Sequence, residues 1–195
     1  LLGVGSFGRV FEGWYRNTTR SQICPFAVKV IPIKRLISTK TQSRVQQEIR
    51  FMRKLKGCNN LVQFYEVQVT KKDVILIMEM AGKNNLEQHL TWLSNRSELL
   101  DESQIKSIAG QIFNAIRFMH ANNLVHRDLK PDNVAITHDG FCKVCDFGMT
   151  VKVKRGFMVK APGGSPLYVP PEQLNHEKID QRYDIWSFGI MLYEL

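Results

Sequence analysis

A short polar run, HRDLKPDN at residues 126–133, constrains this chain more than any other feature. It places a carboxylate (Asp128), an ammonium group (Lys130) and a carboxamide (Asn133) in one loop between two apolar stretches. Phosphoryl transfer needs a carboxylate to orient the attacking hydroxyl, a cation near the moving phosphate, and oxygen ligands for magnesium. These side chains can supply all three. The run therefore predicts a phosphoryl-transfer loop.

A second feature is the glycine-rich segment GVGSFGRV, residues 3–10. Glycine lets the backbone turn tightly and bring its N–H groups close to phosphates. A dinucleotide-binding fold is the alternative, but it requires the third glycine to open a helix. Here an apolar and aromatic stretch, residues 10–15, follows the third glycine and favours a strand. The segment therefore predicts a β-hairpin.

A lysine, Lys29, stands in the middle of the short β-branched run 26–31. Because residues two apart on a strand share a face, Ala27 and Lys29 point the same way. A lone strand lysine is usually a solvated edge residue, so a functional role needs a partner. The candidate is Glu48, which lies in a segment whose apolar residues recur at i, i+4 and i+7 from Val45 and so predict one helical face.

Taken in order, these motifs resemble those of eukaryotic protein kinases, and Asp146-Phe147-Gly148 after the strand-like run 141–145 adds a further match. The lysine two places after Asp128 resembles the serine/threonine branch rather than the tyrosine branch. The resemblance implies an α+β, two-lobed protein kinase fold over residues 1–195. Residues 1–79 are then an N-lobe with an antiparallel sheet and one helix, and residues 80–195 a mainly helical, C-terminally incomplete C-lobe.

The resemblance also implies ATP and Mg²⁺ as cofactors, with Mn²⁺ as a substitute, and a protein substrate with a serine or threonine acceptor. The residues assigned to catalysis are Asp128, Lys130, Lys29 and Glu48. Those assigned to ATP are Leu2, Gly3, Val4, Gly5, Ser6, Phe7, Gly8, Val10, Ala27, Lys29, Glu79, Ala81 and Ala135. Asn133 and Asp146 are assigned to the metal. A pseudokinase scaffold that binds nucleotide without transfer is the alternative, but such proteins usually lack one of the lysine, the two aspartates or the asparagine.

Residues 164–172 resemble the end of a kinase activation segment, with Ser165 where the family usually has threonine. Between Thr150 and Ser165 there is no serine, threonine or tyrosine, so the usual acceptor of an activating phosphate is absent. Arg127, which pairs with that phosphate in many kinases, has no evident local partner. We therefore expect activity that does not depend on phosphorylation there. The run at residues 126–133 resembles the catalytic loop of kinases and is given that name from here on. Asp184 is expected to cap a helix, to accept hydrogen bonds from the backbone of this catalytic loop, or to do both.

The formal net charge of +9 is concentrated at one end of the chain. Residues 1–56 hold 12 Lys and Arg against 2 Asp and Glu, a net of +10. Many of these basic residues flank or lie on the helix that carries Glu48. A solvated face is the favoured interpretation, and a docking patch for an acidic partner is the alternative. No aromatic interleaving or nucleic-acid motif supports nucleic-acid binding.

The four cysteines are expected to be reduced thiols, because Cys142 and Cys145 lie three apart on a predicted strand and no second pair completes a zinc site. Cys145 is expected to border the nucleotide pocket and to be open to covalent ligands. No apolar run approaches the length of a membrane span. The expected location is the cytoplasm, with the nucleus as the alternative. Because the chain ends at Leu195 inside the helix that follows Asp184, we expect a fragment of a longer kinase.

Overall fold

The computed structural model describes residues 1–4, 8–17, 22–137 and 139–195. Three of the residues assigned to ATP, namely Gly5, Ser6 and Phe7, lie outside the described residues. Of Val4 only the backbone is described.

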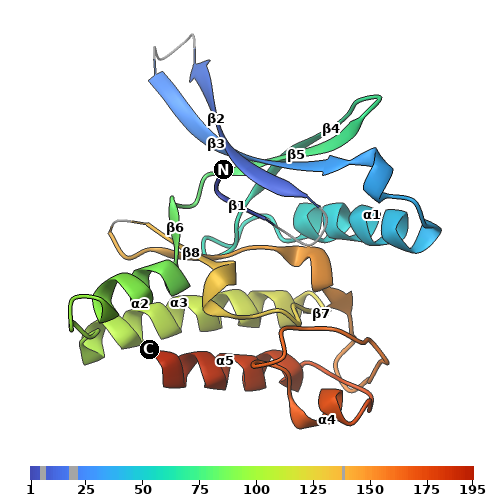
Figure 1. Ribbon diagram of the computed structural model, residues 1–195. Helices are drawn as coiled ribbons and strands as arrows, with labels where there is room; N and C mark the ends of the chain where they lie inside the picture. The colour runs from blue at the N-terminus through green and yellow to red at the C-terminus, as the bar shows by residue number, and fades with distance from the viewer. Residues whose placement is uncertain (5–7, 18–21, 138) are drawn as a thin grey trace.

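Within the described residues, the N-terminal part is a five-stranded antiparallel sheet in the order β1-β2-β3-β5-β4, with helix α1 on one side (Figure 1). Gly3 pairs with Val10 and Val4 with Arg9, so the predicted hairpin is confirmed. Its elements are β1 (Gly3–Val4), β2 (Arg9–Asn17), β3 (Gln22–Pro32), η1 (Ile33–Arg35), α1 (Thr39–Lys54), β4 (Phe64–Val69) and β5 (Asp73–Glu79).

The C-terminal part is mainly helical and lies below the sheet in Figure 1. Its helices are α2 (Leu86–Ser94), α3 (Glu102–Ala121), η2 (Pro131–Asn133), η3 (Phe147–Met149), α4 (Pro171–Leu174) and α5 (Arg182–Glu194). Its short strands are β6 (Asn84–Asn85), β7 (Leu124–Val125), β8 (Val134–Ile136), β9 (Cys142–Val144) and β10 (Val151–Lys152). The predicted α+β architecture is confirmed, whereas the boundary between residues 79 and 80 stays a prediction. In the described part of the chain, no helix has both the length and the apolar content needed to cross a bilayer.

The helix starts have local causes in the sequence. The Ser38 side chain accepts a hydrogen bond from the Thr41 N–H at 3.1 Å and caps α1. At α2 and α3 the capping residue and a glutamine three places later bond to each other's backbone, so each start forms a capping box. These caps satisfy N–H groups that have no partner inside the helix, and so they fix where the helices above and below the cavity begin.

The helical spacing of six apolar residues predicts a long core helix that leads into the catalytic loop, and this helix is α3. The six are Ile105, Ile108, Ala109, Ile112, Phe113 and Ile116. The buried stripe differs from the predicted one. Ile108, Ile112 and Ile116 are buried, as expected. Phe113 was also expected in the core, yet 48% of its surface is exposed and its ring lies 5.9 Å from that of Phe188 on α5. The prediction for Phe113 was wrong because apolar periodicity marks a wide stripe, and the neighbouring helices decide which edge of it is covered.

Candidate active site

A cavity of about 460 Å³ lies between the sheet and the helical part. The predicted residues that line it come from β1–β3, α1, the 79–82 connector, the catalytic loop and the segment around β9. They are Leu2, Gly3, Val10, Ala27, Lys29, Glu48, Glu79, Ala81, Asp128, Lys130, Asn133, Ala135 and Asp146. Segments far apart in the sequence thus converge on one site.

One described residue assigned to ATP, Gly8, is not among the described residues that line the cavity. At Gly8 the structure shows why glycine is required. A Cβ atom there would lie 2.2 Å from the backbone oxygen of Val30 on β3. A side chain at this position would therefore push β2 away from β3.

Lys29 is the centre of the site. Its Nζ lies 2.5 Å from Oε1 of Glu48 on α1 and 3.2 Å from Oδ1 of Asp146, which follows β9. The side chains of Lys29 and Glu48 are both almost fully buried. The strand lysine therefore has the helix partner that the sequence predicted, together with a second carboxylate.

The charges of Lys29, Glu48 and Asp146 are set by their burial and by the contact of one ammonium group with two carboxylates. Burial opposes the charge on Lys29, but the attraction of Glu48 and Asp146 outweighs it and raises the pKa of the lysine. Burial raises the pKa of Glu48 against the attraction of the lysine. For Asp146, Lys29 and the Gly148 N–H outweigh the effect of burial, and its pKa is lowered. Lys29 is thus held as a cation and Asp146 as an anion.

In the catalytic loop, Asp128 is oriented by two neighbours. The Ser165 hydroxyl donates to Asp128 Oδ1 at 2.7 Å, and the Asn133 amide donates to Oδ2 at 2.9 Å and to the Asp128 carbonyl at 2.7 Å. Both neighbours come from motifs identified in the sequence. Asp128 is therefore fixed with its carboxylate at the cavity, where a hydroxyl group could approach it.

The catalytic loop is held from below by Asp184. Its carboxylate accepts hydrogen bonds from the backbone N–H groups of His126 and Arg127, both at 2.9 Å, and lies 2.8 Å from His120 Nε2. The expected loop contact is confirmed. The expected helix cap was wrong, because Gln181 is the N-cap of α5 and Asp184 lies inside its first turn.

The oxygen atoms assigned to a metal fit that assignment. Because the Asn133 amide nitrogen donates to Asp128, its carbonyl oxygen is left for another ligand. Asp146 uses Oδ1 for Lys29 and for the Gly148 N–H at 3.3 Å, which leaves Oδ2. Hard oxygen donors of this kind suit Mg²⁺, which keeps waters and phosphate oxygens as its other ligands. Among the described residues, no group of three or more His, Cys, Asp or Glu could hold a metal alone.

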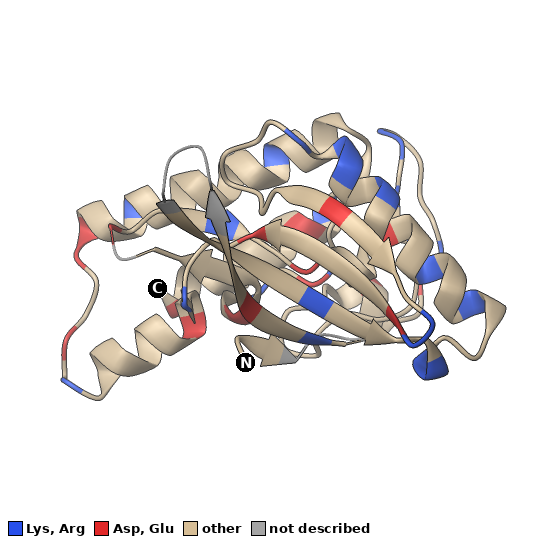
Figure 2. Ribbon diagram, turned by 90° about the horizontal axis from the view of Figure 1, so that it is seen from above, with Lys and Arg blue, Asp and Glu red and all other residues tan. Residues whose placement is uncertain are grey.

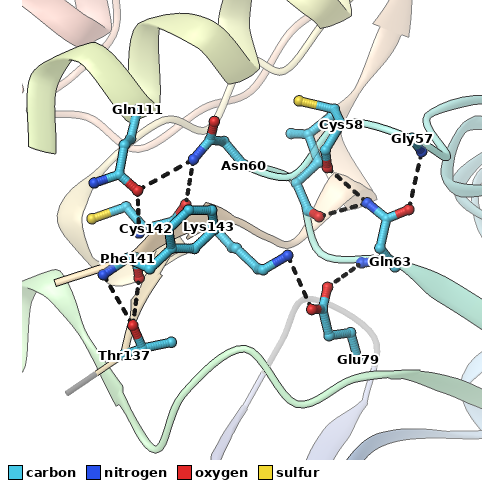
Figure 3. A network of polar contacts seen from close by, with 11 residues as sticks. Gly57, Cys58, Asn60, Gln63, Glu79, Gln111, Thr137, Phe141, Cys142 and Lys143 are labelled. Atoms are coloured by element: carbon cyan, nitrogen blue, oxygen red, sulfur yellow. Dashed lines mark hydrogen bonds and ion pairs between the residues drawn. The ribbon is translucent and has the colours of Figure 1, made fainter. Parts of the chain in front are cut away.

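A polar network behind the connector was missed by the sequence analysis (Figure 3). Lys143 on β9 lies 3.0 Å from Glu79 at the end of β5, and the other Glu79 oxygen accepts from the Gln63 N–H at 3.1 Å. The Gln63 side chain in turn donates to the carbonyls of Cys58 and Leu61, both at 2.8 Å. The network joins the segment after α1, the end of the sheet and β9. No sequence motif marks it, because its members are far apart along the chain.

Residues 79–82 connect β5 to β6. By resemblance to protein kinases, the backbone of Glu79 and Ala81 in this connector is expected to bond the adenine of ATP. The Glu79 N–H donates to the Gln63 carbonyl at 2.8 Å, so a contact from Glu79 to adenine would use its carbonyl oxygen. Several lining residues had no place in the sequence prediction of the site. They include Met52, Val62, Met80, Gly82, Lys83, Asn84 and Gln88. Of these, Met52 had a signal, since it belongs to the predicted apolar face of α1.

Arg127 has partners that the sequence did not show. Its guanidinium donates to the carbonyl oxygens of Met149 at 3.2 Å, of Ala161, and of Gly163 at 3.4 Å. The expectation that Arg127 lacks a local partner was therefore wrong. Backbone carbonyls of the activation segment are its partners, and they cannot be recognised from residue types.

Cys145 borders the cavity as expected, but the structure contradicts its expected reactivity. Burial, reinforced by the neighbouring Asp146 carboxylate, raises the pKa of the Cys145 thiol to about 12. The thiolate is the reactive species, so a thiol with this pKa is a poor nucleophile at neutral pH.

The fold and the cavity are those that the resemblance to protein kinases implies. The sequence profile of the protein kinase domain matches residues 1–195. The chain therefore belongs to the protein kinase domain family.

Curated relatives agree with this assignment. Over its whole length the chain is 35% identical to Serine/threonine-protein kinase 36 of Pongo abelii and covers 14% of that protein. It is 32% identical to Serine/threonine-protein kinase TIO of Arabidopsis thaliana, again over its whole length and 14% of the relative. It is also 34% identical to CBL-interacting serine/threonine-protein kinase 21 of Arabidopsis thaliana and covers 44% of it. The chain thus spans less than half the length of these relatives.

The first prediction concerns the buried ion pair. Replacing Lys29 by Met leaves Glu48 charged in a buried position, and the free energy of unfolding should fall by about 3–5 kcal/mol. Adding Glu48→Gln should restore part of this loss. Urea unfolding monitored by circular dichroism measures both effects.

The matched control is Lys106→Met. Lys106 and Glu102 also lie 2.5 Å apart, but both side chains are exposed. The free energy of unfolding of the Lys106→Met variant should therefore fall by less than about 1 kcal/mol. Equal losses for Lys29→Met and Lys106→Met would contradict the importance of burial.

The second prediction concerns the pH dependence of Cys145. With its pKa near 12, about one thiol in 10⁵ is ionised at pH 7, and the ionised fraction rises about tenfold per pH unit. Alkylation by iodoacetamide should accordingly be slow at pH 7 and accelerate steeply up to pH 9. Mass spectrometry, with Cys145→Ser as the control, measures the rate. Fast alkylation that does not change with pH would contradict the prediction.

Proposed function

We propose that the protein transfers the γ-phosphoryl group of Mg-ATP to serine or threonine hydroxyls of proteins. The observation that carries the proposal is the convergence on one cavity of Asp128, Lys130, Asn133 and Asp146 with the paired Lys29 and Glu48. A family member that had lost transfer would usually lack one of these groups. Most of the rate enhancement should come from positioning and charge neutralisation.

Each group has a proposed role that follows from its contacts. Asp128, fixed by Ser165 and Asn133, orients the acceptor hydroxyl and accepts its proton. Lys130 lies in the same cavity and steadies the γ-phosphate. Lys29, positioned by Glu48, holds the other phosphates. Asn133 and Asp146 would hold Mg²⁺, which neutralises the charge on the phosphate oxygens.

The proposal includes the division into an N-lobe, residues 1–79, and a C-lobe, residues 80–195, with the nucleotide between them. It also places the protein in the cytoplasm, with the nucleus as the alternative. Its four cysteines, Cys24, Cys58, Cys142 and Cys145, are all unpaired, which fits a reducing compartment.

The test of catalysis is transfer of labelled γ-phosphate from Mg-ATP to a degenerate peptide library with Ser, Thr and Tyr acceptors. The protein should label Ser and Thr peptides, and Asp128→Asn and Lys29→Met should each lower the rate at least about 100-fold. Lys106→Met, on the exposed surface of α3, should leave the rate unchanged. Nucleotide binding without transfer by the unsubstituted protein would contradict the proposal and favour the scaffold alternative.

We further propose that transfer does not depend on phosphorylation of the segment that starts at Thr150 and ends before Ser165. The carbonyls of Met149, Ala161 and Gly163 occupy the two terminal nitrogens of Arg127, which a phosphate would otherwise attract, and within the described residues its Nε is buried and unpaired. Thr150, the hydroxyl residue at the start of this segment, is only 5% exposed. A kinase could reach it only after local opening.

Thr150→Ala tests this proposal. Within the described structure the Thr150 hydroxyl has no hydrogen-bond partner, so its removal breaks no bond. The variant should keep a transfer rate within about twofold of the original. Loss of most activity, together with phosphate found on Thr150 by mass spectrometry, would contradict the proposal.

A further inference from the structure

Basic side chains occur all along η1 and α1 and in the turn after them. They belong to Lys34, Arg35, Lys40, Arg44, Arg50, Arg53, Lys54 and Lys56, which we call the α1 basic face. The one acidic residue between positions 34 and 56 is Glu48, which points inward to Lys29. Seen from above, basic residues accompany α1 along its length (Figure 2).

The α1 basic face is exposed and lacks neutralising partners. Seven of its residues are exposed, and Arg44 is half-buried. In the described part of the chain, none of them lies within 4.0 Å of a carboxylate oxygen. Lys54 donates to the Asn122 carbonyl at 2.7 Å, and the Arg53 guanidinium lies 5.7 Å from the ring centre of Phe64. These two contacts orient side chains but leave the charge uncompensated.

The positive charges of the α1 basic face repel one another and so destabilise the folded protein. Arg50 lies three and four residues before Arg53 and Lys54, spacings at which like charges on a helix repel. At the inner edge of the face, burial and then the charge of Arg44 contribute to a lowered pKa of Arg127 in the catalytic loop. An anion bound along α1 would relieve both repulsions.

We propose that the α1 basic face is a docking site for an acidic segment, rich in Asp and Glu, of a partner protein. Charge complementarity carries the choice of partner. Nucleic acid is the less favoured polyanion because single strands bind through stacking on aromatic rings as well as through charge. The other exposed side chains of α1 are those of Thr39, Gln42, Ser43, Gln46 and Gln47, and none of them is aromatic.

The test is fluorescence anisotropy with a fluorescein-labelled peptide of ten glutamates, without ATP, at about 0.05 M and about 0.5 M NaCl. The test variant is Lys40→Glu, Arg50→Glu and Lys56→Glu, three exposed residues of the face. The control variant is Lys106→Glu, Arg117→Glu and Lys178→Glu, exposed residues of the helical part with the same change in net charge. Circular dichroism checks that both variants fold.

The peptide should bind the unsubstituted protein and lose affinity at the higher salt concentration. Its affinity should fall at least about tenfold in the test variant and less than about twofold in the control. Equal weakening in both variants, or no binding to the unsubstituted protein, would overturn the docking proposal. A 20-nucleotide single strand that displaces the peptide and binds more tightly would overturn it in favour of nucleic acid.

Discussion

The charge of one buried ammonium group, that of Lys29, governs the arrangement around the cavity. Taking a charge out of water is costly, and the cost is offset only by well-placed partners. Glu48 comes from α1 and Asp146 from the segment after β9, so one cation connects the sheet, the helix and the proposed magnesium ligand. If α1 moved away, Glu48 would move with it, and Lys29 would keep only Asp146 of its two carboxylate partners. The position of α1 and the surroundings of Asp146 are therefore coupled through Lys29.

Two further polar contacts hold parts of the site that Lys29 does not contact, namely the catalytic loop and β9. Asp184 accepts the backbone N–H groups of His126 and Arg127 and so sets the height of the catalytic loop above α5. Behind the cavity, Lys143 and Glu79 fix β9 against the end of the sheet. Phosphoryl transfer depends mainly on positioning, and these contacts hold the segments that carry Asp128 and Asp146 next to one another.

The parts of the fold and site that the sequence predicts are those in which a residue and its neighbours along the chain form a recognisable motif. The loop at 126–133, the strand with Lys29 and the hairpin at its start are of this kind. The Lys29–Glu48 contact was also predictable, because the resemblance to protein kinases implies it and each residue sits in a strand or helix that matches the family's order of motifs. The contact between Lys143 and Glu79 was not, since neither residue belongs to a motif. The partners of Arg127 were hidden for another reason: they are carbonyl oxygens, which every residue type possesses.

The contacts of Arg127 have a consequence for how this chain can vary over evolutionary time. Hydrogen bonds to carbonyl oxygens do not depend on the side chains of Met149 and Ala161. Other residue types at these two positions can therefore keep the contact with Arg127. Gly163 and Gly164 are different, because their φ angles of +118° and +117° favour glycine. Homologues that share the Arg127 arrangement should accordingly keep the glycine pair while the residues before it diverge.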